Sequence, residues 1–324
     1  MLVVQTQKLD PWRNLALEEL CLDRAGRDGR ILFLWQSSDA VIIGKNQNPW
    51  LECSLPDMEK DGVKLARRLS GGGAVFHDAG NLNFAFVVPR REYKDGTIFD
   101  IVIAALKRCG VEAVRMGKNS LGVHGRKISG NAFCYRRDSV LHHGTLLVAA
   151  DVEKMKRCLS CRHRGIHSKA IRSNPAPVVN LRDVSDAITV PRLAAAIAEA
   201  AVDHGRQEIA WGGEELFDSP CLEQIEKKYA SWEWRFGMTP PFDVEMTSRF
   251  SWGEARVGFR VEKAVVRQST VELQGDYQPI SSVISQGLPG VRFSEADLVD
   301  CLGKQTPAFK KADAVEFARW LVGS

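Results

Sequence analysis

The stretch at residues 65–88 constrains the fold most, because it joins two apolar runs through a cluster of glycines. Arg67 and Arg68 precede three consecutive glycines at positions 71–73. Glycine has no Cβ, so this backbone can take positive φ and approach a ligand closely. Free N–H groups in such a loop can form an anion-binding nest, and the arginines add donors suited to phosphate or carboxylate. The alternative is a glycine-rich hairpin connection with a solvated arginine pair.

Local patterns predict the neighbouring elements. Residues 74–77 and 82–88 read as two strands of a hairpin around the turn signal at 78–80. Asp10-Pro11 reads as an N-cap and first helical position, which starts a helix that runs to about Asp23 and breaks at Gly26 and Gly29. In that helix the apolar residues are expected to face the core, and Glu18 and Glu19 to be solvated.

Apolar periodicity predicts the other elements in the same way. The expected strands are 31–35, 40–43, 63–67, 111–115, 125–137, 140–149, 256–262 and 271–273, and the expected helices are 55–61, 97–109, 152–159, 191–204, 294–302 and one ending near Leu321. The sequence pattern changes near Pro240-Pro241, which we take as a domain junction. The tail after it predicts a small α+β domain.

Charge and composition exclude several classes of protein. The net charge of +4 is too small to indicate nucleic-acid binding. No apolar run reaches the roughly 18 residues that a membrane span needs. The N-terminus lacks the pattern of a secretory signal, so we expect a cytoplasmic protein, or a mitochondrial matrix protein if a presequence has been removed.

Cysteine spacing gives a weak metal signal. Eight cysteines lie at irregular intervals, which is typical of reduced thiols in the cytosol. Cys158 and Cys161 form a Cys-x-x-Cys with His163 and His167 close behind, but the gap is too short for a zinc finger. A zinc or redox site stays an alternative; incidental cysteines are favoured, and no metal ligands are expected.

A second polar stretch lies at residues 125–133. On a strand, Lys127, Ser129, Asn131 and Phe133 would share one face, because side chains alternate. Such a face could bring a lysine to a carboxylate and a phosphate together. The alternative is an exposed face with a snorkelling lysine.

The next strand carries two adjacent histidines, His142 and His143, which must point to opposite faces. One surface and one packed imidazole is the simpler interpretation, and a histidine that lines a ligand pocket is the alternative. No serine nucleophile motif, Walker loop or dinucleotide fingerprint is present.

In combination these segments resemble the lipoate–protein ligase family. The resemblance rests on Arg67-Arg-Leu-Ser-Gly-Gly-Gly-Ala-Val-Phe-His-Asp-Ala-Gly-Asn81, Gly125-Arg-Lys-Ile-Ser-Gly-Asn-Ala132 and His142-His-Gly-Thr-Leu-Leu147. Further matching pieces are Asp10-Pro-Trp-Arg-Asn-Leu-Ala16, Asn48-Pro-Trp50, Gly165-Ile166, Ser168, Asn180-Leu181 and Trp232-Glu-Trp-Arg-Phe-Gly237. The resemblance covers nearly the whole chain and is weakest after about Gly275.

The resemblance implies an α+β fold in two domains. Residues 1–240 would form a large catalytic domain of mixed β-sheets flanked by helices, and residues 241–324 a small accessory domain. It also implies a monomeric enzyme that converts lipoate and ATP to lipoyl-AMP and pyrophosphate. The lipoyl group would then pass to a lysine of lipoyl-carrier domains, namely 2-oxo acid dehydrogenase E2 subunits and the glycine cleavage H protein. No nucleic acid or membrane partner is implied.

The family's pattern also implies site residues. Lys127 would be the catalytic cation that bridges the acyl carbonyl oxygen and the α-phosphate. The other expected adenylate contacts are Arg68, Gly73, Ala74, Val75, Phe76 and Asn119. The expected lipoate contacts are Lys127, Ser70, Gly72, Gly73, His77 and His143. The hairpin after the loop is a candidate wall for the lipoyl tail.

One departure from the family concerns magnesium. Many relatives carry Arg-Asn-Asp where this chain has Lys118-Asn119-Ser120. The missing carboxylate implies that Mg²⁺ is held mainly by the ATP phosphates.

Alternatives to the ligase are a transferase that uses preformed lipoyl-AMP, an octanoyl transferase with a cysteine nucleophile, a biotin ligase and a non-enzymatic carrier-binding module. Pyrophosphate release from ATP in the absence of carrier protein separates the ligase from the transferase.

Overall fold

The computed structural model describes residues 1–161, 165–205, 208–306 and 308–323. The chain divides into two compact units. The first unit comprises Met1–Lys45, Val63–Met155 and Ser173–Ala230, and the second comprises Asn46–Gly62, Lys156–Arg172 and Ser231–Ser324. Two internal segments therefore belong with the C-terminal part of the chain. The expected domain boundary between residues 240 and 241 stays a prediction.

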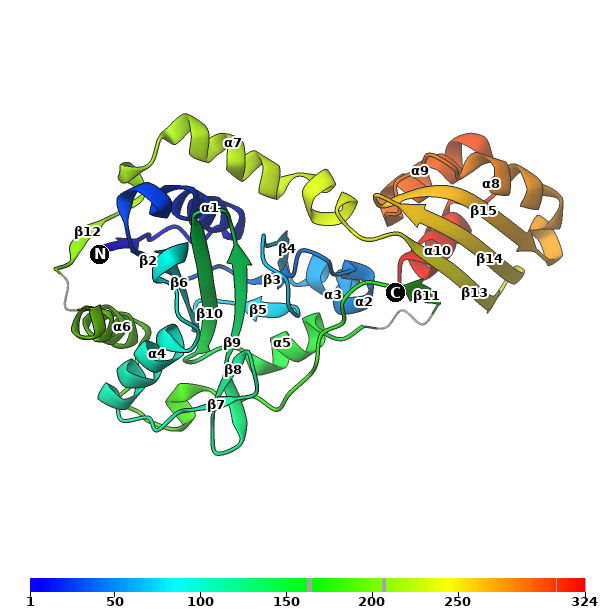
Figure 1. Cartoon of the computed structure of the whole chain (residues 1–324). Coiled ribbons are helices and arrows are strands. Elements are labelled where there is room, and N and C mark those ends of the chain that lie inside the picture. The colour runs from blue at the N-terminus through cyan, green and yellow to red at the C-terminus, as the bar shows by residue number, and fades with distance from the viewer. Residues whose placement is uncertain (162–164, 206–207, 307, 324) are drawn as a thin grey trace. The chain divides into compact units, whose positions relative to one another are not determined.

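The elements are labelled in chain order (Figure 1). The strands are β1 (Leu2–Gln5), β2 (Ile31–Trp35), β3 (Ala40–Ile43), β4 (Lys64–Arg67), β5 (Val75–His77), β6 (Asn81–Pro89), β7 (Val114–Met116), β8 (Ser120–Val123), β9 (Arg126–Tyr135), β10 (Ser139–Leu147), β11 (Ile166–Ser168), β12 (Ala210–Gly212), β13 (Phe242–Phe250), β14 (Gly253–Glu262) and β15 (Val265–Leu273). The α-helices are α1 (Pro11–Asp28), α2 (Pro49–Glu52), α3 (Leu55–Lys60), α4 (Thr97–Arg108), α5 (Val152–Cys158), α6 (Val190–Gly205), α7 (Ser219–Ala230), α8 (Ser281–Gly287), α9 (Glu295–Gln305) and α10 (Lys311–Val322). The short helical turns are η1 (Arg90–Glu92), η2 (Leu181–Asp183), η3 (Glu214–Leu216), the π-helical η4 (Glu233–Gly237) and η5 (Gly275–Ile280).

An eight-stranded sheet in the order β12-β1-β2-β6-β10-β9-β8-β7 forms the frame of the first unit. Its first three strands are parallel and the others pair antiparallel, so the sheet is mixed as expected. Helices α4 and α6 pack on one face, where the apolar side chains of β2 and β6 form a core with them. Helix α1 also packs against β2, β6 and β10 (Figure 1). These helices fix the positions of β9 and β10, which carry site residues.

A second, three-stranded sheet in the order β4-β3-β5 carries the glycine loop. Strand β3 pairs parallel with β4 and antiparallel with β5. The expected hairpin of 74–77 with 82–88 is therefore wrong, because β5 pairs in this sheet while β6 pairs with β2 and β10 in the large sheet. The turn at 78–80 passes the chain from one sheet to the other.

Caps at the helix ends follow the sequence closely. The side chain of Asp10 accepts from the backbone N–H groups of Trp12 and Arg13, and Pro11 begins α1. Ser294 caps α9 by accepting from the N–H of Asp297. Helix α1 runs through Gly26 to Asp28, so the expected end near Asp23 and the break at Gly26 are wrong, whereas the break at Gly29 is confirmed, because Gly29 is the C-cap.

In the second unit, β11, β13, β14 and β15 form an antiparallel sheet with α8 packed on β15. Its core includes the rings of Trp50, Phe236, Phe242 and Phe293. The centroid of the Trp50 ring lies 5.3–5.4 Å from those of the other three rings, and the centroids of Phe242 and Phe293 lie 5.7 Å apart. The alternating strand predicted at 256–262 is confirmed as β14, and the sequence reading missed β13. Among the described residues, no helix combines the length and apolarity of a membrane span.

Candidate active site

A cavity of about 670 Å³ opens in the first unit and is lined by the glycine loop, β9, β10 and α1. Some lining residues are almost fully buried, including the apolar Leu15, Trp35 and Phe84. Others, Lys118 and Asn119, are exposed. The lining therefore combines buried apolar side chains with exposed polar ones, which suits a ligand that has an apolar part and a charged part.

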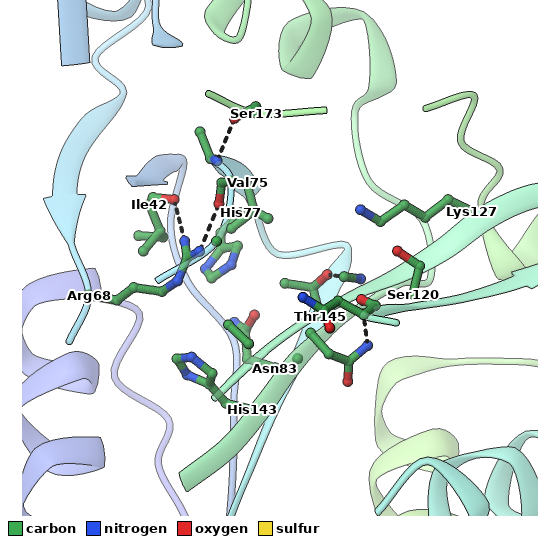
Figure 2. Close-up of a pocket in the computed structure, with 18 of the residues that line it drawn as sticks. Ile42, Arg68, Val75, His77, Asn83, Ser120, Lys127, His143, Thr145 and Ser173 are labelled. Carbon is green, nitrogen blue, oxygen red and sulfur yellow. Dashed lines mark hydrogen bonds between the residues drawn. The ribbon is translucent and has the colours of Figure 1, made fainter. Parts of the chain in front are cut away.

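Most of the expected site residues meet in this cavity. Its lining includes Arg68, Gly72, Gly73, Ala74, Val75, His77, Asn119, Lys127 and His143. Ser70 and Phe76 are buried behind the lining. Figure 2 shows Arg68, His77 and His143 gathered on the side away from Lys127 and Ser120.

The two arginines before the glycines have different tasks. Arg67 is fully buried, and its guanidinium donates to the carbonyls of Gly44 and Lys45 at 3.2 and 3.0 Å. Arg68 is also buried but lines the cavity. The alternative of a solvated arginine pair is therefore wrong, since neither side chain is exposed. Only Arg68 is placed to act on a ligand in this cavity.

The glycine loop is folded around the guanidinium of Arg68. Nη2 donates to the carbonyls of Gly71 and Gly73 at 2.6 and 2.8 Å, and Nη1 donates to Ile42 O at 3.0 Å. Burial lowers the pKa of Arg68 to about 10, and the charge of Glu18 opposes this shift. Gly72 between the two bonded carbonyls has φ of 87°, a left-handed conformation that favours glycine.

Lys127 stands on β9, where a register shift changes which side chains share a face. Ser129 pairs with Leu121 but Lys127 pairs with the next residue, Gly122, so Ile128 is an extra residue. As a result, Lys127 lines the cavity together with Gly130, Asn131 and Ala132, whereas Ile128 and Phe133 pack in or against the core. The expected common face is wrong for Lys127 but holds for Ser129, Asn131 and Phe133, because Asn131 donates to Ser129 Oγ and both Asn131 and Phe133 contact His142.

The amino group of Lys127 lies close to Gly130: if residue 130 had a Cβ, that atom would lie 3.2 Å from Lys127 Nζ. Burial lowers the pKa of Lys127, and the positive charge of Arg68 lowers it further. Within the described ranges no carboxylate pairs with this lysine. An anionic ligand would relieve both costs, which makes Lys127 the strongest anion-binding candidate in the cavity.

Residues 173–179, which the sequence motifs did not indicate, contact both the glycine loop and strand β9. The N–H of Ala74 donates to Ser173 Oγ at 2.8 Å (Figure 2). A few residues on, Lys127 N donates to Pro177 O at 2.8 Å and Val179 N donates to Lys127 O at 3.0 Å. Residues 173–179 therefore connect the glycine loop to the lysine strand.

Both histidines of β10 are buried, so the interpretation of one surface imidazole is wrong. They do point to opposite faces: His143 lines the cavity, whereas His142 packs within 4.8 Å of the Phe99 ring and 4.4 Å of the Phe133 ring. Burial lowers the pKa of His142 to about 3. His143 is bonded to Glu18, whose 3% exposure overturns its expected solvated position.

Several buried wall atoms lack a partner among the described residues. They are Trp35 Nε1, Asn83 Nδ2 and both ring nitrogens of His77. Burial, with the charges of Arg68 and His143, lowers the pKa of His77 to about 3, so its imidazole is neutral. A ligand or water must supply the hydrogen bonds of these atoms.

The cavity offers little to a metal or a covalent intermediate. Among its described lining residues Glu18 is the only carboxylate, and there is no cysteine. No cluster of three or more His, Cys, Asp or Glu suited to a metal occurs in the part of the chain that the structure describes. Cys158 is buried and Cys161 is half-buried, and His163 lies outside the described residues.

The cavity thus brings the cations Arg68 and Lys127 together with buried apolar side chains, an arrangement that suits an enzyme acting on an acid with an apolar tail. Residues 10–202 match the model of the lipoyl protein ligase A/B catalytic domain, and residues 239–321 match the bacterial lipoate protein ligase C-terminus. A curated relative, lipoate-protein ligase A of Psychrobacter cryohalolentis, is 36% identical over 99% of this chain and 98% of its own length.

Solved structures agree. P. falciparum LipL1 in complex with lipoate is 25% identical, with a TM-score of 0.65 over 100% of this chain and 99% of that chain. A bipartite lipoate protein ligase with its E2 lipoyl domain from Thermoplasma acidophilum, at 24% identity and a TM-score of 0.60 over 73% of this chain and 96% of that chain, shares the fold. The chain is an enzyme of the lipoate–protein ligase family.

Proposed function

We propose that this chain joins lipoate to protein in two steps at one cavity. A lipoate carboxylate oxygen attacks the α-phosphorus of ATP, and pyrophosphate leaves. The ε-amino group of a carrier lysine then attacks the carbonyl carbon of lipoyl-AMP, loses a proton and releases AMP. The observation that carries this proposal is Lys127, a half-buried cation without a carboxylate partner in the described chain, which lines a cavity that has both buried apolar and exposed polar side chains.

Lys127 suits the first step because adenylation brings two anions together. A fixed cation at the forming anhydride stabilises the charge that builds on the phosphorus and acyl oxygens. Its lowered pKa reflects a free-energy cost that the anionic reactants remove. In this proposal Asn119, an exposed residue of the cavity lining, contacts the adenylate.

The glycine loop suits the acyl group. Arg68 donates to the carbonyls of Gly71 and Gly73, and Gly72 to Val75 line the cavity. We assign Arg68 and the backbone of 73–76 to holding the adenylate and acyl carbonyl. Gly72, His77 and His143 would surround the lipoyl tail, with Ser70 acting from behind the wall.

Mg²⁺ would accompany ATP in this proposal. The cavity has no carboxylate near Lys127 in its described lining, so the phosphates would supply most of the ligands. When bound, the ion neutralises phosphate charge; the protein's own contribution is the cation of Lys127.

The acyl acceptor would be a lipoyl-carrier domain, of the E2 or glycine cleavage H protein kind. The T. acidophilum relative is described with its E2 lipoyl domain, which supports this class of partner. A monomeric state and a cytoplasmic location stay predictions.

Pyrophosphate release tests the proposal. The purified chain is mixed with ATP, Mg²⁺ and lipoate, without carrier. Lipoate-dependent pyrophosphate supports activation. Activity that appears only with supplied lipoyl-AMP would replace the proposal with a transferase.

A further inference from the structure

A chain of buried hydrogen bonds runs from α1 to the glycine loop. Glu18 Oε1 lies 2.8 Å from His143 Nδ1, and His143 Nε2 lies 2.6 Å from Ser70 Oγ. Arg68 Nε donates to the same Ser70 oxygen at 3.0 Å. The other end of that guanidinium holds the loop carbonyls. We name this set, Glu18, His143, Ser70 and Arg68, the loop relay.

The hydrogens of this set follow from its chemistry. Arginine can only donate, so Ser70 Oγ accepts from Arg68. The hydroxyl of Ser70 also lies 3.5 Å from Gly71 O, so its own hydrogen points either to that carbonyl or to His143 Nε2, depending on the tautomer of His143. In both arrangements the imidazole links Ser70 to the Glu18 carboxylate, so the relay has a carboxylate at one end and a guanidinium at the other.

Ser70, His143 and Glu18 have the order of a nucleophilic triad, but the geometry excludes that role here. Ser70 is 1% exposed and is not among the residues that line the cavity. Its oxygen is already occupied by Arg68. A nucleophile must reach its substrate, so Ser70 acts on the loop and not on the ligand.

We propose that Glu18 and Ser70 are positioning residues, which hold Arg68 and through it the glycine loop in the shape that accepts the acyl group. Glu18 is 3% exposed and is the only carboxylate among the described residues of the cavity wall. Its charge faces a buried guanidinium through the relay. Without it, Arg68 loses its compensating charge and His143 loses the anchor that keeps its ring in register with Ser70. This inference rests on the proposed function for its kinetic arm only.

The kinetic arm compares Glu18→Gln, Ser70→Ala and the double variant with the unchanged chain. In the pyrophosphate assay we expect each single variant to raise the KM for lipoate roughly tenfold, the size of a lost charge-assisted or doubly used hydrogen bond. The KM for carrier protein should not move. The double variant should resemble either single variant, because both break the same relay.

Glu19→Gln is the matched control for Glu18→Gln. Glu19 is the next residue on α1, is 9% exposed and pairs with Lys228 at 2.5 Å. Ser37→Ala is the control for Ser70→Ala, since Ser37 is likewise buried and is not part of the cavity wall. These controls should leave the KM for lipoate within about twofold, even if they lower the melting temperature as much.

Amide hydrogen exchange provides a second arm that needs no activity. In folded protein, Glu18→Gln and Ser70→Ala should speed exchange in the peptide that covers residues 70–76 by tenfold or more, while Glu19→Gln should not. If the unchanged chain fails to release pyrophosphate with lipoate, the proposed function fails and exchange still decides the relay. Unchanged exchange at 70–76 in both relay variants, or an equal rise in the controls, would overturn the inference.

Discussion

Replacement of Lys127 by alanine is the most informative single perturbation. Its amino group lies over Gly130 in the cavity, and no carboxylate of the described chain competes with a ligand for it. Loss of one preorganised donor at developing charge typically costs about 10²–10³ in rate, which is about 3–4 kcal/mol. We therefore expect Lys127→Ala to lower kcat/KM for lipoate activation at least a hundredfold.

Folding should survive this change. Burial and the charge of Arg68 lower the pKa of Lys127, so loss of the charge itself does not destabilise the folded state at neutral pH. Lys118→Ala is the control, because Lys118 lines the same cavity but is exposed, where an ionic contact is worth little. We expect Lys118→Ala to retain activity within about fivefold.

Pyrophosphate release at saturating ATP, with a melting curve for each variant, is the assay. The pH profile adds a second check. Lys127 must be protonated to act, and its pKa lies below the ordinary 10.5, so kcat/KM should fall on the alkaline side below that pH. Near-normal activity in folded Lys127→Ala, or equal losses in both variants, would refute the assigned role.

Further predictions concern buried polar groups. Burial lowers the pKa of His142 to about 3 in the folded state, against about 6.5 when unfolded. Between these pH values only the unfolded state binds the proton, so the free energy of unfolding decreases as the pH falls. His142→Phe should flatten this slope by up to about 1.4 kcal/mol per pH unit in urea titrations, and parallel curves for the two proteins would contradict it. Ser173→Ala removes the acceptor for the Ala74 N–H and should raise the KM for lipoate about threefold to tenfold; an unchanged KM would show that this bond is idle. Trp35→Phe removes an unpartnered indole N–H that a ligand sulfur can satisfy and a methyl group cannot, so the ratio of kcat/KM for lipoate over octanoate should fall a few-fold, and a constant ratio would exclude Trp35 from specificity.

Sequence reasoning succeeded where the cause is local. The capping signals at Asp10 and Ser294 involve neighbours within three residues, and both caps form. The apolar run at 31–35 and the stripe at 97–109 also became β2 and α4. Such patterns depend on the period of one element and need no knowledge of its partners.

The errors arose where a distant partner decides. Strands β5 and β6 are adjacent in sequence, yet they belong to different sheets, because β5 pairs with β3 and β6 pairs with β2. Glu18 has the spacing of a solvated acid, and only His143, 125 residues away, explains its burial. No local signal encodes such pairs.

The residues that make up the candidate site were predicted more accurately than the faces on which their side chains lie. The motifs brought Arg68, Lys127 and His143 together in one cavity, as the family resemblance implies. The bulge in β9 does not show in the strand pattern, so the alternation placed Lys127 on the face of Ser129, Asn131 and Phe133, which it does not share. Trp35 and Ser173 were missed, because each looks like an ordinary core or loop residue until the fold places it at the cavity.

If this one cavity makes lipoyl-AMP, the chain alone must form it. The chain is incubated with ATP, Mg²⁺ and lipoate, without carrier, and pyrophosphate is measured together with protein-bound lipoyl-AMP. We expect both to form with lipoate in equal amounts, and both to vanish in Lys127→Ala. Pyrophosphate release that ignores lipoate, or lipoylation of a carrier only from supplied lipoyl-AMP, would contradict this expectation.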